Sequence, residues 1–139
     1  MLILILLAGG AYAQQKTVRI LAIGNSFSQD AVEQYLHELA EAEDISTIIG
    51  NMFIGGCSLE RHVKNARDNA PAYAYRKIGT DGKKREKGKM SLEAVLADED
   101  WDYVSLQQAS PFSGMYETYE ASLPELIEYV KARLPKKTK

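Results

Sequence analysis

The chain is poor in cysteine, in histidine and in excess charge of either sign. Its 139 residues include one cysteine, Cys57, and two histidines. A single cysteine cannot form an intrachain disulfide, even in an oxidising compartment. The formal net charge is only −2, which argues against a general nucleic-acid-binding protein. Internal repeats and low-complexity linkers are also lacking, so the composition and length predict one ordinary globular domain.

The N-terminal residues form a separate segment. Residues 1–8 are almost wholly aliphatic, and residues 11–13 fit the small-x-small pattern of a secretory cleavage site, although no Lys or Arg precedes the apolar run. The run is too short to span a bilayer. We therefore predict a signal peptide over residues 1–13 and a mature domain over residues 14–139 without a stable membrane span. Such a protein is exported to the periplasm or the extracellular space, or is associated with the envelope. A first buried strand is the alternative interpretation.

The most informative stretch is a strand, a turn and a helix with a serine at the turn. Residues 18–23 form a largely apolar run that is typical of a buried strand. Gly24 and Asn25 permit a sharp reversal, and the spacing of Asp30 and Glu33 predicts a capping box at a helix start. Ser26 is then expected at the carboxyl end of a strand, facing the positive end of a helix, where backbone N–H groups stabilise an oxyanion.

The remaining periodicity predicts an α/β fold. The expected elements are helices over residues 31–43, 58–67, 91–97 and 123–134, strands over residues 45–54 and 101–107, and a hairpin over residues 73–89 that turns at Asp81-Gly82. Residues 45–54 are expected to be interrupted at Gly50. The element order implies a mostly parallel sheet with helices on both faces and an added β-hairpin.

Three loops are expected to meet at the carboxyl ends of the parallel strands, where ligands bind in such sheets. The loops are residues 24–28, 55–58 and 107–114. They contribute a hydroxyl, backbone N–H groups free of side chains, and amide donors, on Ser26, Gly55, Gly56, Gln107 and Gln108. A nucleophile with three convergent donors has the composition of an oxyanion hole.

The same loops carry a family resemblance. Gly24-Asn25-Ser26-Phe27-Ser28 resembles the opening motif of the SGNH (GDSL-like) hydrolase superfamily, with Asn25 where Asp is usual. Gly55-Gly56 resembles its second block and residues 102–110 its third, and the whole of residues 18–134 is similar to an uncharacterised exported bacterial branch. The resemblance implies a flavodoxin-like three-layer α/β/α sandwich. It also implies hydrolysis of esters, with O-acyl (acetyl) groups on carbohydrates as the expected substrates and with no metal or organic cofactor.

The resemblance assigns roles to particular residues. Ser26 is the expected nucleophile, and its own N–H, the Gly56 N–H and a Gln107 amide are the expected oxyanion donors. Gln107 stands near the position where the family usually has asparagine. The further residues expected to border or bind a small-molecule or carbohydrate ester are Asn25, Gly55, His62, Gln108 and Ser110.

The chain departs from the family in lacking the C-terminal Asp-x-x-His block that activates the serine. It therefore resembles the N-terminal part of a longer hydrolase, with a third strand whose open apolar edge lacks a neighbour. His37 and His62 are the only imidazoles that could substitute as a base, and neither has an orienting carboxylate at a recognisable spacing. Because triad members act as a unit, we expect this chain alone to be nearly inactive.

Alternative interpretations apply to the same residues. Ser26 could only cap a helix, the glycines only turn the chain, and His62 only pack as a partly exposed helical residue. Cys57 is a reactive thiol or, more commonly, a small buried filler. The basic hairpin is a solvated ribbon or a lid that attracts acidic glycans. For the whole chain, a non-catalytic anion- or glycan-binding module and an inactive remnant are the alternatives to a hydrolase.

Overall fold

The computed structural model describes residues 16–139, and the predicted signal peptide lies outside them. The domain is built on one five-stranded sheet with the strand order β4-β3-β2-β1-β5. The strands are β1 (Val18–Gly24), β2 (Thr47–Phe53), β3 (Tyr73–Ile78), β4 (Lys84–Met90) and β5 (Tyr103–Leu106). β2, β1 and β5 run parallel, whereas β3 and β4 join antiparallel to one another and to β2.

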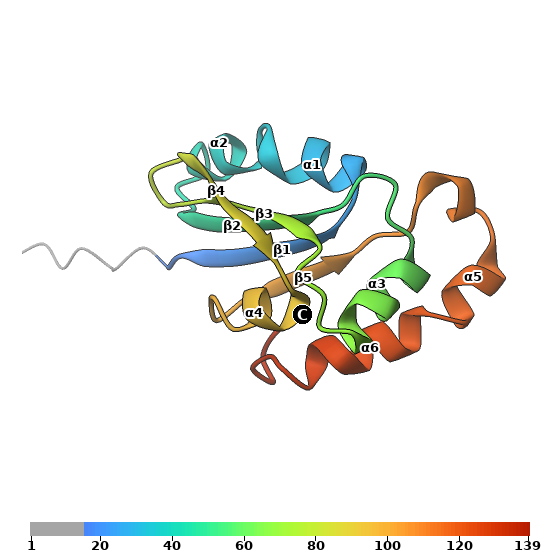
Figure 1. The fold of residues 1–139 in the computed structure, drawn as a ribbon. Coiled ribbons are helices and arrows are strands. Elements are labelled where there is room, and N and C mark those ends of the chain that lie inside the picture. The colour runs from blue at the N-terminus through green and yellow to red at the C-terminus, as the bar shows by residue number, and fades with distance from the viewer. Residues whose placement is uncertain (1–15) are drawn as a thin grey trace, which may run out of the picture.

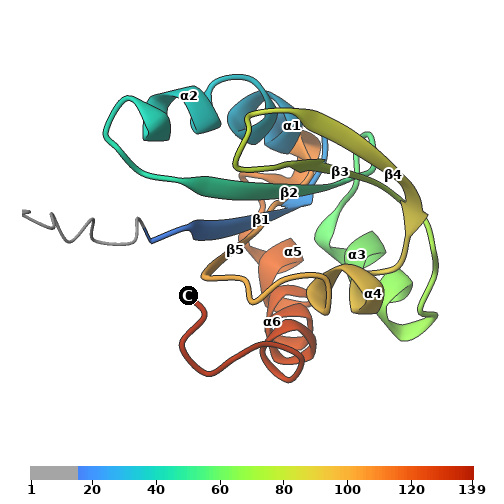
Figure 2. The same ribbon diagram turned by 90° about the vertical axis from the view of Figure 1, so that its left-hand side faces the viewer.

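Helices cover both faces of this sheet (Figures 1 and 2), with α1 and α2 on one face and α3, α4 and α6 on the other. The helices are α1 (Ser26–Glu33), α2 (Leu36–Glu41), α3 (Leu59–Arg67), α4 (Leu92–Leu96), α5 (Tyr116–Glu120) and α6 (Leu123–Lys131), with a 3-10 turn η1 (Ser110–Phe112). The larger core lies on the α3, α4 and α6 side, where Leu59, Leu92 and Leu126 are fully or almost fully buried. Within residues 16–139, no helix is both long enough and apolar enough to cross a membrane.

The predicted α/β class is confirmed, but the sheet is less parallel than expected. Two of its four strand pairs are parallel and two are antiparallel. The reason is the hairpin, which adds both of its strands to the main sheet at the free edge of β2. The predicted turn at Asp81-Gly82 is present, and Gly82 has a φ of +68°, a conformation that glycine adopts without strain.

The first helix begins earlier than predicted. Asn25 rather than Asp30 is the N-cap, and its side-chain oxygen accepts a hydrogen bond from the Phe27 N–H at 3.2 Å. The expected helix over residues 31–43 is also two helices, α1 and α2, because the chain leaves helical geometry at Tyr35. The apolar periodicity therefore does not continue across the break, and Leu39 is 65% exposed.

The second strand runs through Gly50 without the predicted interruption. The glycine serves packing instead, because a Cβ there would lie 2.7 Å from the ring of Trp101. Trp101 is completely buried, and its indole N–H donates to the Val95 carbonyl at 2.9 Å. β2 therefore tolerates a residue of low strand propensity because a bulky neighbour fills the space above it.

Candidate functional site

Asn25 ties together the three loops that follow β1, β2 and β5. Its side chain is 1% exposed, and Nδ2 donates to the Cys57 and Gln108 carbonyl oxygens, each at 3.2 Å. Its backbone N–H donates to Oε1 of Gln107 at 3.4 Å. The loops therefore meet at the carboxyl end of the parallel strands, as the sequence predicts. Asn25 itself is a buried structural residue, and it does not offer the ligand-binding side chain that we expected.

Ser26 stands at the first position of α1 with its side chain exposed. Within residues 16–139, neither its hydroxyl nor its backbone N–H has a hydrogen-bond partner in the protein. The preceding Gly24 allows the loop to close tightly, because a Cβ there would lie 2.6 Å from Oε1 of Gln107 and 2.7 Å from Oγ of Ser28. The arrangement presents an accessible hydroxyl at a helix N-terminus, where the helix dipole favours negative charge.

Gly55 and Gly56 form an exposed turn directly after β2. Gly56 has a φ of +62° and no atom within 4 Å of the position of a Cβ, so the backbone is open to solvent. In the described part of the chain, the Gly56 N–H donates to no protein acceptor. This turn is next to Cys57, whose carbonyl Asn25 binds. The Gly56 N–H is thus a free donor in a loop attached to the Ser26 loop.

The two glutamines after β5 have different roles. Gln108 is 7% exposed, and its Oε1 accepts from the Leu59 N–H at 3.0 Å and from the Ala109 N–H at 2.9 Å. Its Nε2 donates to Oγ1 of Thr118 at 3.0 Å. The Gln108 side chain therefore holds the start of α3 and links it to α5. The side chain of Gln107 uses only its oxygen, toward Asn25, and across residues 16–139 its side-chain N–H groups have no acceptor.

A buried polar network supports the Ser26 loop from below. Oγ of Ser28 lies 2.8 Å from the Asn25 carbonyl and 2.9 Å from Oδ1 of Asn51. Nδ2 of Asn51 donates to Glu33 at 2.5 Å, and Glu33 binds Arg76 at 2.7 Å. Sequence reasoning missed this network, because its members come from α1, β2 and β3. The polar Asn51 within an otherwise apolar strand was the one local signal.

Contrary to the prediction, His62 does not border the site. It is completely buried, its Nδ1 lies 2.9 Å from the Tyr73 hydroxyl and 3.6 Å from Sγ of Cys57, and its ring stacks on that of Tyr73. Burial, with a smaller contribution from Arg61, lowers its pKa to about 4. The helix face that carries His62 packs inward because Leu59, Val63 and Ala66 anchor α3 on the sheet. His62 therefore neither contacts a ligand nor packs as a partly exposed residue, which were the two roles predicted from the sequence.

The other candidate groups are equally constrained. Burial raises the pKa of the Cys57 thiol to about 11, so the filler interpretation fits better than a reactive thiol. His37 is buried on α2, and its Nδ1 lies 2.9 Å from Oγ1 of Thr47. Thr47 begins β2, so His37 lies at the amino end of the parallel strands, opposite Ser26. Across residues 16–139, no group of three or more His, Cys, Asp or Glu could hold a metal ion.

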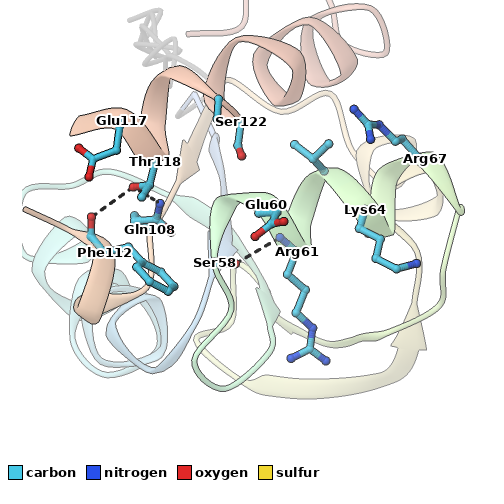
Figure 3. A pocket seen from close by; sticks show the side chains of 12 residues that line it. Ser58, Glu60, Arg61, Lys64, Arg67, Gln108, Phe112, Glu117, Thr118 and Ser122 are labelled. Atoms are coloured by element: carbon cyan, nitrogen blue, oxygen red, sulfur yellow. Dashed lines mark hydrogen bonds between the residues drawn. The ribbon is translucent and has the colours of Figure 1, made fainter. Parts of the chain in front are cut away.

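A cleft of about 760 Å³ adjoins the loops on the α3 and α5 side (Figure 3). Ser58 and Gln108 connect it to the Gly56 and Gln107 loops. Its other walls come from α3, η1, α5 and the start of α6 and mix polar or charged residues with apolar ones. The lining residues are Glu60, Arg61, Val63, Lys64, Arg67, Phe112, Glu117, Thr118, Ala121 and Ser122. Ser110 is exposed at the start of η1 but does not line the cleft. Sequence analysis predicted neither η1 nor α5, which form one wall.

The comparisons with known proteins identify a family. The model of a domain of unknown function, DUF4886, matches residues 19–138. The chain belongs to the DUF4886 family. A crystal structure of a DUF4886 family protein from Bacteroides uniformis is 68% identical, with a TM-score of 0.87 over 88% of this chain and 48% of that chain. This DUF4886 chain therefore spans about half the length of that relative. No curated protein matches it.

Proposed function

We propose that this DUF4886 protein is a serine ester hydrolase of the SGNH (GDSL-like) type, with a flavodoxin-like arrangement of sheet and helices. The proposal is supported above all by the accessible Ser26 hydroxyl and by donors that have no acceptor within residues 16–139, on loops that Asn25 ties together. These donors are the N–H groups of Ser26 and Gly56 and the amide of Gln107. Hydrogen-bond donors placed where an oxyanion develops are commonly a large term in acyl-transfer catalysis.

The chemistry proceeds in two steps. Oγ of Ser26 attacks the ester carbonyl carbon, and the carbonyl oxygen becomes an oxyanion that the Gly56 and Gln107 donors stabilise. The C–O bond to the alcohol then breaks, and the alcohol leaves with a proton. Water next attacks the acyl-serine ester, which releases the carboxylic acid and restores the hydroxyl.

A base must remove the serine proton. We propose that this base belongs to a part of the protein outside residues 16–139. His62 and His37 are both buried and engaged elsewhere. The crystallised relative is about twice as long as the aligned region, which leaves room for an Asp/His pair. The substrates that we favour are O-acylated carbohydrates, because the adjoining cleft places hydroxyl, carboxylate and guanidinium groups beside apolar side chains such as Phe112. Export of the protein remains part of this proposal.

Activity-based labelling tests the proposal directly. A fluorophosphonate probe should label Ser26 in a protein that extends to the length of the relative, and 4-nitrophenyl acetate should be hydrolysed. Ser26→Ala should remove both signals, whereas Ser105→Ala, at an exposed serine on β5 outside the three loops, should leave both unchanged. Labelling that persists in Ser26→Ala, or is absent from the folded longer protein, contradicts the assignment.

A binding module is the second candidate, favoured by one observation. The free Ser26 N–H at the start of α1 can hold an anion without any base. This function predicts that inorganic phosphate or acetate binds with an affinity that Ser26→Ala does not change, and that esters are not hydrolysed. An inactive remnant predicts neither binding nor labelling.

A further inference from the structure

The outer edge of β5 carries the start of another strand pairing. β5 is the last strand of the sheet, next to β1. The Lys139 N–H donates to the Asp102 carbonyl at 3.0 Å, and the Val104 N–H donates to the Lys139 carbonyl at 2.9 Å. Two such bonds flanking one residue are the pattern of a parallel ladder, with Lys139 opposite Tyr103. Figures 1 and 2 both show the end of the chain beside β5.

The side chains agree with this register. Residues opposite one another in neighbouring strands lie on the same face of a sheet. The Lys139 ammonium lies 6.0 Å from the centre of the Tyr103 ring, as this rule requires. Oγ1 of Thr138 also donates to the Trp101 carbonyl at 2.7 Å, so two consecutive residues are attached along this edge.

An apolar groove of about 630 Å³ lies beside this edge, between β5 and α6. Its apolar lining comes mainly from Val104, Leu106, Leu123, Ile127, Val130 and Leu134. On the other face of the strand, Tyr103 and Ser105 are exposed. An added strand would therefore cover apolar groups on one face only, which requires apolar side chains at alternate positions.

We propose that one more parallel strand pairs with the outer edge of β5, and that it is the polypeptide continuing past Lys139 in a longer form of this protein. Two observations favour this occupant. Lys139 already makes two hydrogen bonds to β5, and the alignment covers only 48% of the crystallised relative's chain. The register places the first and third residues after Lys139 opposite Val104 and Leu106, facing the groove. We therefore expect the first and third residues after Lys139 to be apolar.

The direction of the strand has a consequence for the candidate site. Because the pairing is parallel, the carboxyl end of the new strand emerges beside Gln107, at the edge where the Ser26 and Gly56 loops meet. The loop that follows it borders the site. This inference does not rest on the proposed hydrolase, since it concerns backbone pairing that exists whether or not Ser26 is a nucleophile.

Amide hydrogen exchange measured by NMR tests the proposal in the protein made from its natural coding sequence. By the alternation of a strand, the Leu106 N–H points the same way as that of Val104, toward the outer edge. It should exchange at least about 100-fold more slowly in the longer protein than in a chain ending at Lys139. The Gln107 N–H, which already donates to the Ile23 carbonyl at 3.1 Å, is the internal control and should be protected in both.

Substitutions in the apolar groove between β5 and α6 provide a second test of the proposal. Ile127→Asp should reduce the protection of the Leu106 amide in the longer protein, whereas Glu128→Asp, on the exposed side of α6, should not. Protection of Gln107 reports whether each variant folds. A Leu106 amide that exchanges rapidly in the folded longer protein overturns the proposal. So does a charged residue at the first or third position after Lys139, or a coding sequence that stops at Lys139. A rapidly exchanging Leu106 amide or a charged residue at these positions leaves the fluorophosphonate test of Ser26 unaffected, whereas a coding sequence that stops at Lys139 removes the longer protein on which that test depends.

Discussion

The buried imidazole of His62 makes the stability of this protein depend on pH. Burial lowers its pKa from 6.5 to about 4 in the folded state, whereas an unfolded chain has the ordinary value. Below pH 6.5 the unfolded state therefore binds the proton that the folded state excludes. The stability that a neutral His62 allows is complete above pH 6.5 and is lost as the pH falls toward 4.

The size of this effect follows from the two pKa values. Each tenfold change in proton affinity is worth about 1.4 kcal/mol, so the full difference is about 3 kcal/mol. About 2 kcal/mol of this is lost between pH 7 and pH 5. The salt-bridged Asp98 and Glu125 titrate mainly below this pH range, because their pKa values are lowered from their ordinary values of 3.8 and 4.5. Their contribution is lost at more acidic pH.

Urea unfolding at several pH values measures this loss. Trp101, the single tryptophan, is buried and reports unfolding by fluorescence. A His37→Gln background removes the other imidazole, and His62→Gln is compared with its parent in that background. The parent should lose about 2 kcal/mol more than His62→Gln between pH 7 and pH 5. Parallel pH profiles for the two proteins would refute the reasoning, whatever their difference in absolute stability.

Three further substitutions test the packing around the site. Asn25→Asp replaces a donor to two carbonyls by a carboxylate and should cost about 2–4 kcal/mol in urea unfolding, whereas the exposed Asn69→Asp should change little. Gly50→Ala pushes a methyl group to 2.7 Å from a buried indole and should lower stability by about 1–3 kcal/mol, against no comparable loss for Gly114→Ala, where no atom lies within 4 Å. Glu33→Gln removes the buried carboxylate that pairs with the largely buried Arg76 and should cost about 3 kcal/mol in the same assay; an unchanged unfolding midpoint would contradict the importance of that ion pair.

Local signals in the sequence predicted much of the fold. The largely apolar run before Gly24, the Asp81-Gly82 turn and the helical periodicity of residues 58–67 each act over a few residues, and all three elements are present. The start of the first helix was predicted wrongly because Asn25 and Asp30 are both good caps. Local chemistry did not distinguish them. Asn25 is the cap because its side chain also donates to the carbonyl oxygens of Cys57 and Gln108, which are 32 and 83 residues away.

By itself, the sequence determined the strand-turn-helix around Ser26 and the loops that follow the parallel strands, because periodicity and turn chemistry are local. Tertiary structure alone decided which polar groups remain free. It buried the inward face of α3 with His62, engaged both ends of the Gln108 amide, and, within residues 16–139, left the side-chain N–H groups of Gln107 without an acceptor. Adjacent glutamines look equivalent in a sequence. Their hydrogen-bond partners are set by residues far along the chain, and only the packed fold brings those residues together.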